Sequence, residues 1–117
     1  MTKKASIQKD LAKRLGASLS AARKQAALTQ GELAEKVGVD TETISRFERG
    51  ATMPSLVTLQ MLAVDLNVTM AELIGEASSM PNDQAQLIAS WLSPLSVADR
   101  HLLLDMNKIW ASRLQRR

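Results

Sequence analysis

Apolar residues recur at spacings of three and four along most of the chain, whereas strand-like alternation is nearly absent and Gly and Pro are sparse. This periodicity predicts an all-α fold. The expected helices lie at residues 8–27, as a short pair within 30–49, from 55 to 66, from 69 to about 75, at 83–93 and at 97–115.

The segment at residues 78–82 is rich in Ser and carries Pro81, which is typical of a linker. It separates an expected N-terminal domain, residues 1–77, from an expected C-terminal helical hairpin, residues 78–117. Thr69 and Glu72 have the spacing of a capping box and are expected to begin the last helix of the first domain.

The short pair of helices has clear end signals. Thr29 and Glu32 form a second candidate capping box, in which each side chain binds the backbone N–H of the other residue. Gly38 tolerates the left-handed conformation that ends a helix, and Asp40 can cap the next helix directly afterwards. Because Gly50 stops that next helix, the sequence predicts a helix-turn-helix.

Two helices joined this closely must cross at short range, which demands particular residue sizes. Ala34 is small enough for the crossing, and Gly38 supplies the sharp turn that follows. Val37, Ile44 and Phe47 are apolar and suited to fill the angle beneath the two helices. We therefore expect these residues to form the core of the motif.

The second helix of the motif has two different sides. At 100° per residue, Ile44 and Phe47 point one way. The opposite side is polar and consists of Glu42, Ser45, Arg46 and Arg49, with Thr41 at the helix start. In the major groove of B-DNA, Arg can bind guanine, Glu can accept from cytosine, and Ser or Thr can read several base edges. The alternative is that Glu42 and Arg46, spaced i and i+4, simply pair on the surface.

Charge adds a weaker argument for a nucleic-acid partner. The net charge is +3 and the isoelectric point is about 9.6. The first 24 residues hold seven Lys or Arg, among them Arg23 and Lys24, against one acid. Such a local density can face phosphates, although it is also compatible with a solubilising terminus.

The 117 residues include no Cys and a single His, and the carboxylates are not clustered. The sequence therefore predicts no metal, no cofactor and no disulfide. An enzyme with catalytic residues is disfavoured, because no nucleophile–base pair or phosphate-binding loop is present. No apolar run approaches the roughly 18 residues of a membrane span, so we expect a cytoplasmic protein without a membrane partner.

A family resemblance rests on several short stretches that follow one another along the chain. They are Leu28-Thr29-Gln30, Glu32 to Val39, Thr43 to Gly50, Pro54-Ser55, Leu59, Leu62-Ala63 and Leu66-Asn67-Val68. With them, residues 15–74 resemble the DNA-binding domain of the Cro and lambda-type phage repressor family, also called the Xre-like family. The resemblance implies a five-helix repressor-type domain that binds double-stranded DNA.

The same resemblance implies roles for individual residues. Base contacts would come from Thr41, Glu42, Ser45 and Arg46, and contacts to the DNA backbone from Gln30, Thr43 and Arg49. Arg23 would form a structural ion pair with Glu48. Arg23 and Lys24 also belong to the basic segment and are expected to contact DNA phosphates. Gly31 departs from the better helix formers expected at its position.

The C-terminal hairpin holds both Trp residues and is too apolar for a solvated tail. Helix-turn-helix proteins usually bind two half-sites as two-fold dimers, and large aromatic anchors suit such an interface. The expected dimer interface consists of Trp91, Leu95, Leu103, Met106 and Trp110. The alternative is that the hairpin folds back and completes the core of one monomer.

The favoured function is that of a transcriptional repressor that binds a pseudo-palindromic operator as a homodimer, at the nucleoid of a prokaryote or of a phage-infected cell. One alternative is an antitoxin whose hairpin caps a small toxin protein. Another is an interaction module that keeps the fold without binding DNA, and it would show no salt-dependent duplex binding.

Overall fold

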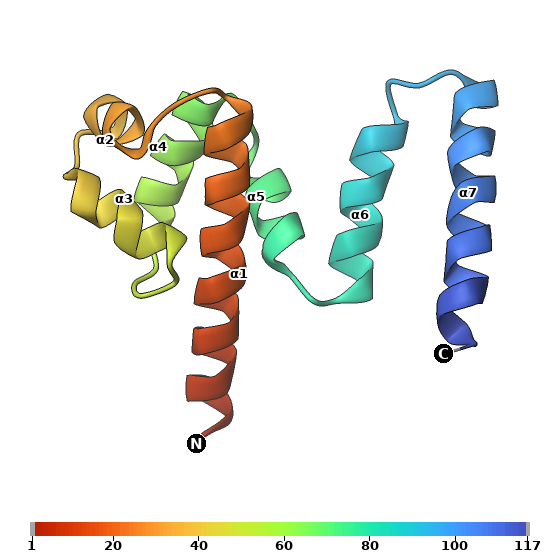
Figure 1. The fold of residues 1–117 in the computed structure, drawn as a ribbon, viewed down its shortest axis with the longest axis horizontal. Coiled ribbons are helices and arrows are strands. Elements are labelled where there is room, and N and C mark those ends of the chain that lie inside the picture. The colour runs from red at the N-terminus through yellow and green to blue at the C-terminus, as the bar shows by residue number, and fades with distance from the viewer. Residues whose placement is uncertain (1, 117) are drawn as a thin grey trace. The chain divides into compact units, whose positions relative to one another are not determined.

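The computed structural model of the protein describes residues 2–116, and their regular secondary structure is entirely helical (Figure 1). The helices are α1 (Lys3–Gln25), α2 (Gln30–Val37), α3 (Thr41–Glu48), α4 (Leu56–Leu66), α5 (Met70–Ala77), α6 (Pro81–Leu92) and α7 (Val97–Gln115). The all-helical prediction is confirmed for this range. Met1 and Arg117, the outer ends of the two expected domains, lie outside the described residues.

The chain divides into two compact units, Met1–Leu87 and Ile88–Arg117. The division falls inside α6, whereas the linker-like composition lies just before that helix; the domain boundary after residue 77 stays a prediction. No single helix within residues 2–116 is long and apolar enough to cross a membrane. Within the same residues, α4 and α5 taken as a pair are long and apolar enough, but the chain bends by 108° between them.

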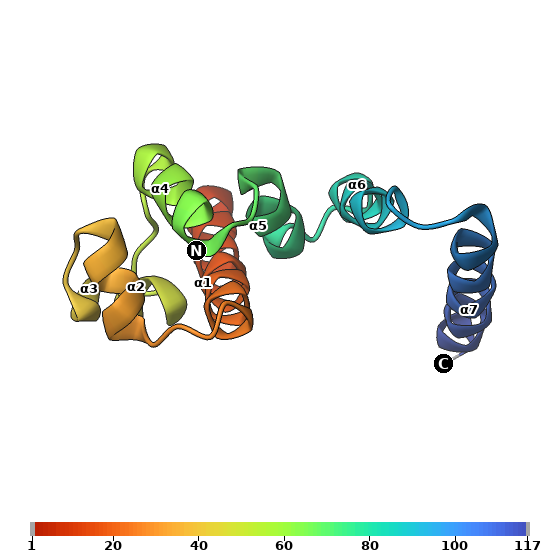
Figure 2. The ribbon, with the colours of Figure 1, turned by 90° about the horizontal axis from the view of Figure 1, so that it is seen from above.

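One apolar core holds α1 to α5 together. In the first unit, α1 lies between α3 on one side and α5 on the other (Figures 1 and 2). The core consists of Leu15, Leu19, Leu33, Ala34, Val37, Ile44, Phe47, Leu59, Leu62, Ala63, Leu66, Leu73 and Ala77. Buried Ser18 adds a polar link, because its hydroxyl donates to the carbonyl of Leu73 at 3.0 Å.

Helix α1 is longer than the apolar pattern predicts. It begins at Lys3 because the hydroxyl of Thr2 accepts a hydrogen bond from the backbone N–H of Ala5. The first buried residue is Ala12, so the first turns of α1 carry no core position that a sequence pattern could reveal. At the other end, Ala27 adopts a left-handed conformation with φ of 58°, beyond the last helical residue.

The helix caps agree with the sequence at some ends and differ at others. The capping box of Thr29 and Glu32 is complete, and Gly38 ends α2 with φ of 85°. Asp40 precedes α3, but its side chain makes no capping bond; its carbonyl accepts from the N–H of Thr43. The expected capping box at Thr69 and Glu72 is incomplete. The Thr69 hydroxyl accepts from the backbone N–H of Glu72, but the Glu72 carboxylate accepts from the Thr69 hydroxyl instead of from the backbone N–H of Thr69.

The C-terminal end of α3 is pressed against α1. A Cβ atom at Gly16 would lie 2.4 Å from the carbonyl oxygen of Phe47 and 2.6 Å from that of Glu48. A Cβ atom at Gly50, which has φ of 73°, would lie 2.7 Å from the Cα of Lys13. Because the facing atoms are backbone, a larger residue at Gly16 or Gly50 would force the two helices apart.

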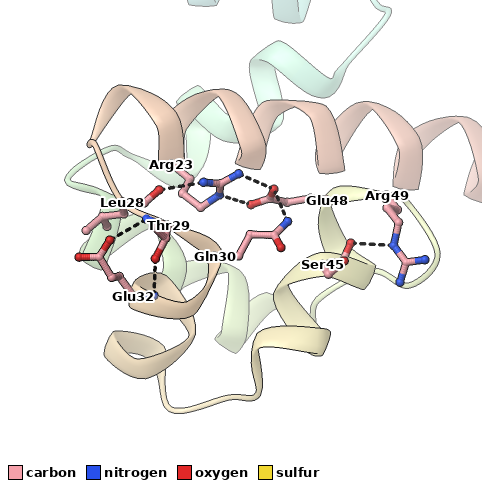
Figure 3. A network of polar contacts seen from close by, with 8 residues as sticks. All are labelled: Arg23, Leu28, Thr29, Gln30, Glu32, Ser45, Glu48 and Arg49. Atoms are coloured by element: carbon pink, nitrogen blue, oxygen red, sulfur yellow. Dashed lines mark hydrogen bonds and ion pairs between the residues drawn. The ribbon is translucent and has the colours of Figure 1, made fainter.

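A polar cluster of Arg23, Gln30 and Glu48 fastens the same contact (Figure 3). Arg23 donates from Nε and Nη2 to the two carboxylate oxygens of Glu48, at 2.7 and 3.0 Å. The Gln30 amide donates to Glu48 at 3.0 Å, and Nη1 of Arg23 donates to the carbonyl of Leu28 at 2.8 Å. The cluster therefore ties α1, α2 and α3 to one another.

The pair within this cluster is shielded from solvent, with the side chains of Arg23 and Glu48 only 11% and 6% exposed. Burial by itself raises the pKa of the Glu48 carboxyl. The hydrogen bonds from Arg23, Gln30 and Ser20, together with the charge of Arg23, outweigh burial and bring this pKa below its usual value. Glu48 is therefore ionised in the folded protein at neutral pH.

Replacing Glu48 by Ala should lower the free energy of unfolding by about 3 to 5 kcal/mol, because Arg23 is left buried without its counter-ion. Urea unfolding at neutral pH measures the loss. Asp10→Ala is the control: it removes the ion pair between Asp10 and Arg14, whose side chains are 59% and 45% exposed, and should cost about 1 kcal/mol or less. Equal losses for the two variants would contradict the structural role of the buried pair.

The lowered pKa of Glu48 also predicts a pH dependence. Because the folded protein holds this carboxyl ionised more strongly than the unfolded chain does, its contribution is complete above the unfolded pKa of about 4.3. The contribution is lost as pH falls from there through the lower, folded pKa. Urea unfolding between about pH 7 and pH 3 should show a component of acid destabilisation that Glu48→Gln lacks, and identical pH profiles would refute it.

Candidate nucleic-acid interface

The packing of α3 decides which of its side chains face solvent. Ile44 and Phe47 are 1% and 8% exposed and point into the core. Beneath the crossing of α2 and α3, Ala34 and Val37 are buried as well, and Gly38 makes the turn between the helices. The outward side of α3 is exposed at Thr41, Glu42, Arg46 and Arg49 and half-buried at Thr43 and Ser45.

The first turn of α2 borders the start of α3. A Cβ atom at Gly31 would lie 3.6 Å from Oγ1 of Thr41, which is ordinary van der Waals contact. The neighbouring Gln30 is half-buried and its amide reaches Glu48 at the other end of α3. Gln30, which is expected to contact phosphate, therefore lies in the turn of α2 that borders the start of α3.

Charged side chains on the outward side of α3 pair with one another. Glu42 lies 3.5 Å from Nε of Arg46 and 3.0 Å from Nη2 of Arg49. Arg49 also donates from Nε to the carbonyl of Ser45 at 3.3 Å (Figure 3). These side chains are 56% to 60% exposed, so their pairing is worth about 0 to 1 kcal/mol and is readily exchanged for another partner.

The two basic residues at the end of α1 differ in their surroundings. Lys24 is exposed, whereas the guanidinium of Arg23 is already bonded to Glu48 and Leu28. Arg23 therefore has a structural role in this state, and its expected phosphate contact stays a prediction, as does that of Lys24.

The C-terminal helices α6 and α7 expose much of their apolar surface. Neither α6 nor α7 contains a buried residue. Trp91, Met106 and Trp110 are 54%, 49% and 58% exposed, and Leu95 and Leu103 are half-buried. The turn between α6 and α7 is held by Arg100, which donates to the carbonyls of Leu92 and Ser93.

Sequence reasoning missed two features that shape this surface. Gly16 and Gly50 fix the seat of α3, but a close approach between distant segments leaves no local signal beyond the glycine itself. The pairing of Arg49 with Glu42 was also not expected, although their spacing of seven residues is two helical turns and indicates one side of the helix. Within residues 2–116, no group of three or more His, Cys, Asp or Glu residues is placed to hold a metal ion.

Comparison with known proteins agrees with this geometry. A helix-turn-helix family model matches residues 19–73. The immunity repressor protein of Bacillus phage phi105 is 33% identical over 72 residues, which cover 62% of this chain and 50% of that protein, so the match spans half the length of the phage repressor. The HTH-type transcriptional regulator ImmR of Bacillus subtilis is 30% identical over 95 residues, covering 80% of this chain and 75% of that protein.

Solved structures show the same fold. The clp gene regulator ClgR from C. glutamicum is 33% identical with a TM-score of 0.56, covering 57% of this chain and 86% of that chain. A chain from a complex of the SinR and SinI proteins is 27% identical with a TM-score of 0.51, covering 84% of this chain and 98% of that chain. The chain therefore belongs to the Xre-like helix-turn-helix family, whose members include phage repressors and bacterial transcriptional regulators.

Proposed function

We propose that the protein is a sequence-specific regulator, and in particular a repressor, that binds double-stranded DNA through the outward side of α3. The observation that carries the proposal is the division of α3 into a buried apolar side, Ile44 and Phe47, and an exposed side of hydrogen-bonding residues. Eight residues make α3 about 12 Å long, which suits a helix lying in the major groove.

The side chains along α3 have suitable chemistry for reading bases. The Arg46 guanidinium can bind guanine, and the Glu42 carboxylate can accept from an amino group such as that of cytosine. Thr41 and Ser45 offer hydroxyl groups that donate and accept. The exposed ion pairs of Glu42 are weak enough to be replaced by contacts with base edges.

A second set of residues would hold the DNA backbone. The helix dipole gives the N-terminus of α2 a partial positive charge that favours a phosphate, and Gln30 lies at that end. Thr43 on α3 and Arg49 directly after it, with Arg23 and Lys24 at the end of α1, complete the proposed backbone contacts. Such contacts set affinity and register but carry no sequence information.

We further propose that the second unit joins two copies of the chain. On α7, several large apolar side chains stay about half exposed: Leu102, Met106, Ile109, Trp110 and Leu114. Full burial of one such side chain stabilises by about 1.5 to 3 kcal/mol. A second copy of the same hairpin offers a matching apolar surface and would place two α3 helices on two half-sites.

A different protein on the same surface is the second candidate, because one similar structure is a complex of SinR with SinI and the similarity spans 84% of this chain. An antitoxin would use its hairpin in this way. Co-purification with a small protein encoded next to this chain would favour that candidate over the homodimer.

Arg46→Ala should lower affinity for the selected operator by about 1 to 3 kcal/mol and relax the preference at one base pair. Gln30→Ala should instead weaken binding to all duplexes alike, because a phosphate contact is blind to sequence. Competition binding with an operator selected from a random pool and with random duplex measures both. Equal losses on the two duplexes for both variants would contradict the assignment, and the absence of salt-dependent binding by the wild type would favour a module that does not bind DNA.

Trp110→Ala should shift a dimer toward monomer in sedimentation equilibrium, because a large anchor is removed from the proposed interface. Leu104→Ala is a matched control, since Leu104 is 52% exposed but lies on a different side of α7. An unchanged molar mass for Trp110→Ala, or an equal shift for both variants, would argue against this interface.

A further inference from the structure

Glu42 stands between two arginines on the surface of α3. One of its carboxylate oxygens lies 3.0 Å from Nη2 of Arg49 and 3.5 Å from Nε of Arg46. Arg49 is also oriented by its bond to the carbonyl of Ser45. The carboxylate therefore offsets half of the positive charge that the two guanidinium groups bring to the side of α3 that is proposed to face DNA.

A carboxylate on a DNA-facing surface is an unusual choice for affinity alone. DNA phosphates repel it, and it is favourable only where it accepts from an amino group on a base edge. A neutral residue at this position would leave both arginines free to bind phosphates of any sequence. The charge of Glu42 thus opposes binding to most duplexes.

We infer that Glu42 is a specificity-determining residue, which holds Arg46 and Arg49 back from DNA of the wrong sequence. The inference rests on the proposed function. On a wrong sequence, the arginines exchange the carboxylate only for phosphates, and Glu42 is left unpaired among negative charges. On the right sequence, Arg46 gains guanine and Glu42 gains a base amino group, so all the charged groups are again paired.

Glu42→Gln tests this directly, because glutamine keeps the size and the acceptor of the side chain but removes its charge. Affinity for random duplex should rise, and its salt dependence should steepen by about 0.9 in the slope of log affinity against log salt, as expected for one more phosphate contact. The gain over the wild type should therefore shrink about threefold between about 50 and 200 mM salt. The ratio of operator to random affinity should fall.

Two controls separate this role from a simple change in net charge. Glu35→Gln makes the same charge change at an exposed carboxylate of α2 and should leave the affinity ratio unchanged. In an Arg49→Gln background, the gain from Glu42→Gln on random duplex should be smaller, because one of the two arginines that Glu42 restrains is already absent.

The outcomes distinguish failure of the proposed DNA-binding function from failure of the inference about Glu42. Absence of duplex binding by the wild type would overturn the proposed function and this inference with it. Wild-type binding with the same affinity ratio in Glu42→Gln would overturn the inference alone. Equal effects of Glu35→Gln and Glu42→Gln, or full additivity with Arg49→Gln, would also overturn it, because the charge would then act without the arginines.

Discussion

The backbone contact between α1 and the end of α3 is the constraint on which the rest of the first unit depends. At Gly16 and Gly50 the two segments approach so closely that no Cβ atom fits. The buried ion pair of Arg23 and Glu48 stabilises the same contact, and its two hydrogen bonds also restrict the orientation of the two helices. With the position of α3 fixed in this way, the side of α3 that faces outward is fixed too.

The two glutamates of α3, Glu42 and Glu48, have different surroundings and therefore different roles. Glu48 is buried, accepts from Arg23 and Gln30, and binds the helix to its neighbours. Glu42 is exposed and lies beside Arg46 and Arg49 with weak, exchangeable pairing. The inward carboxylate therefore serves structure, while the outward one is the residue proposed to influence the choice of DNA.

Local signals in the sequence were sufficient for the helices and for the motif, because caps and apolar periodicity are properties of neighbouring residues. Thr29 with Glu32, and the apolar pair of Ile44 and Phe47, are examples. The start of α1 was missed because its first turns face solvent and carry no apolar period, although Thr2, an N-cap residue type, precedes it. The approach at Gly16 and the pairing of Glu42 with Arg49 depend on tertiary packing or on side-chain choice, which a pattern does not record.

The central claim is that the outward side of α3 is the DNA-reading surface. Chemical-shift mapping by NMR, during titration with a duplex selected from a random pool, tests it most directly. The account predicts that the largest changes occur at Thr41, Ser45 and Arg46 and at the first turn of α2, while the core residues Ile44 and Leu62 change little. Changes confined to other helices, with α3 unaffected, would contradict it.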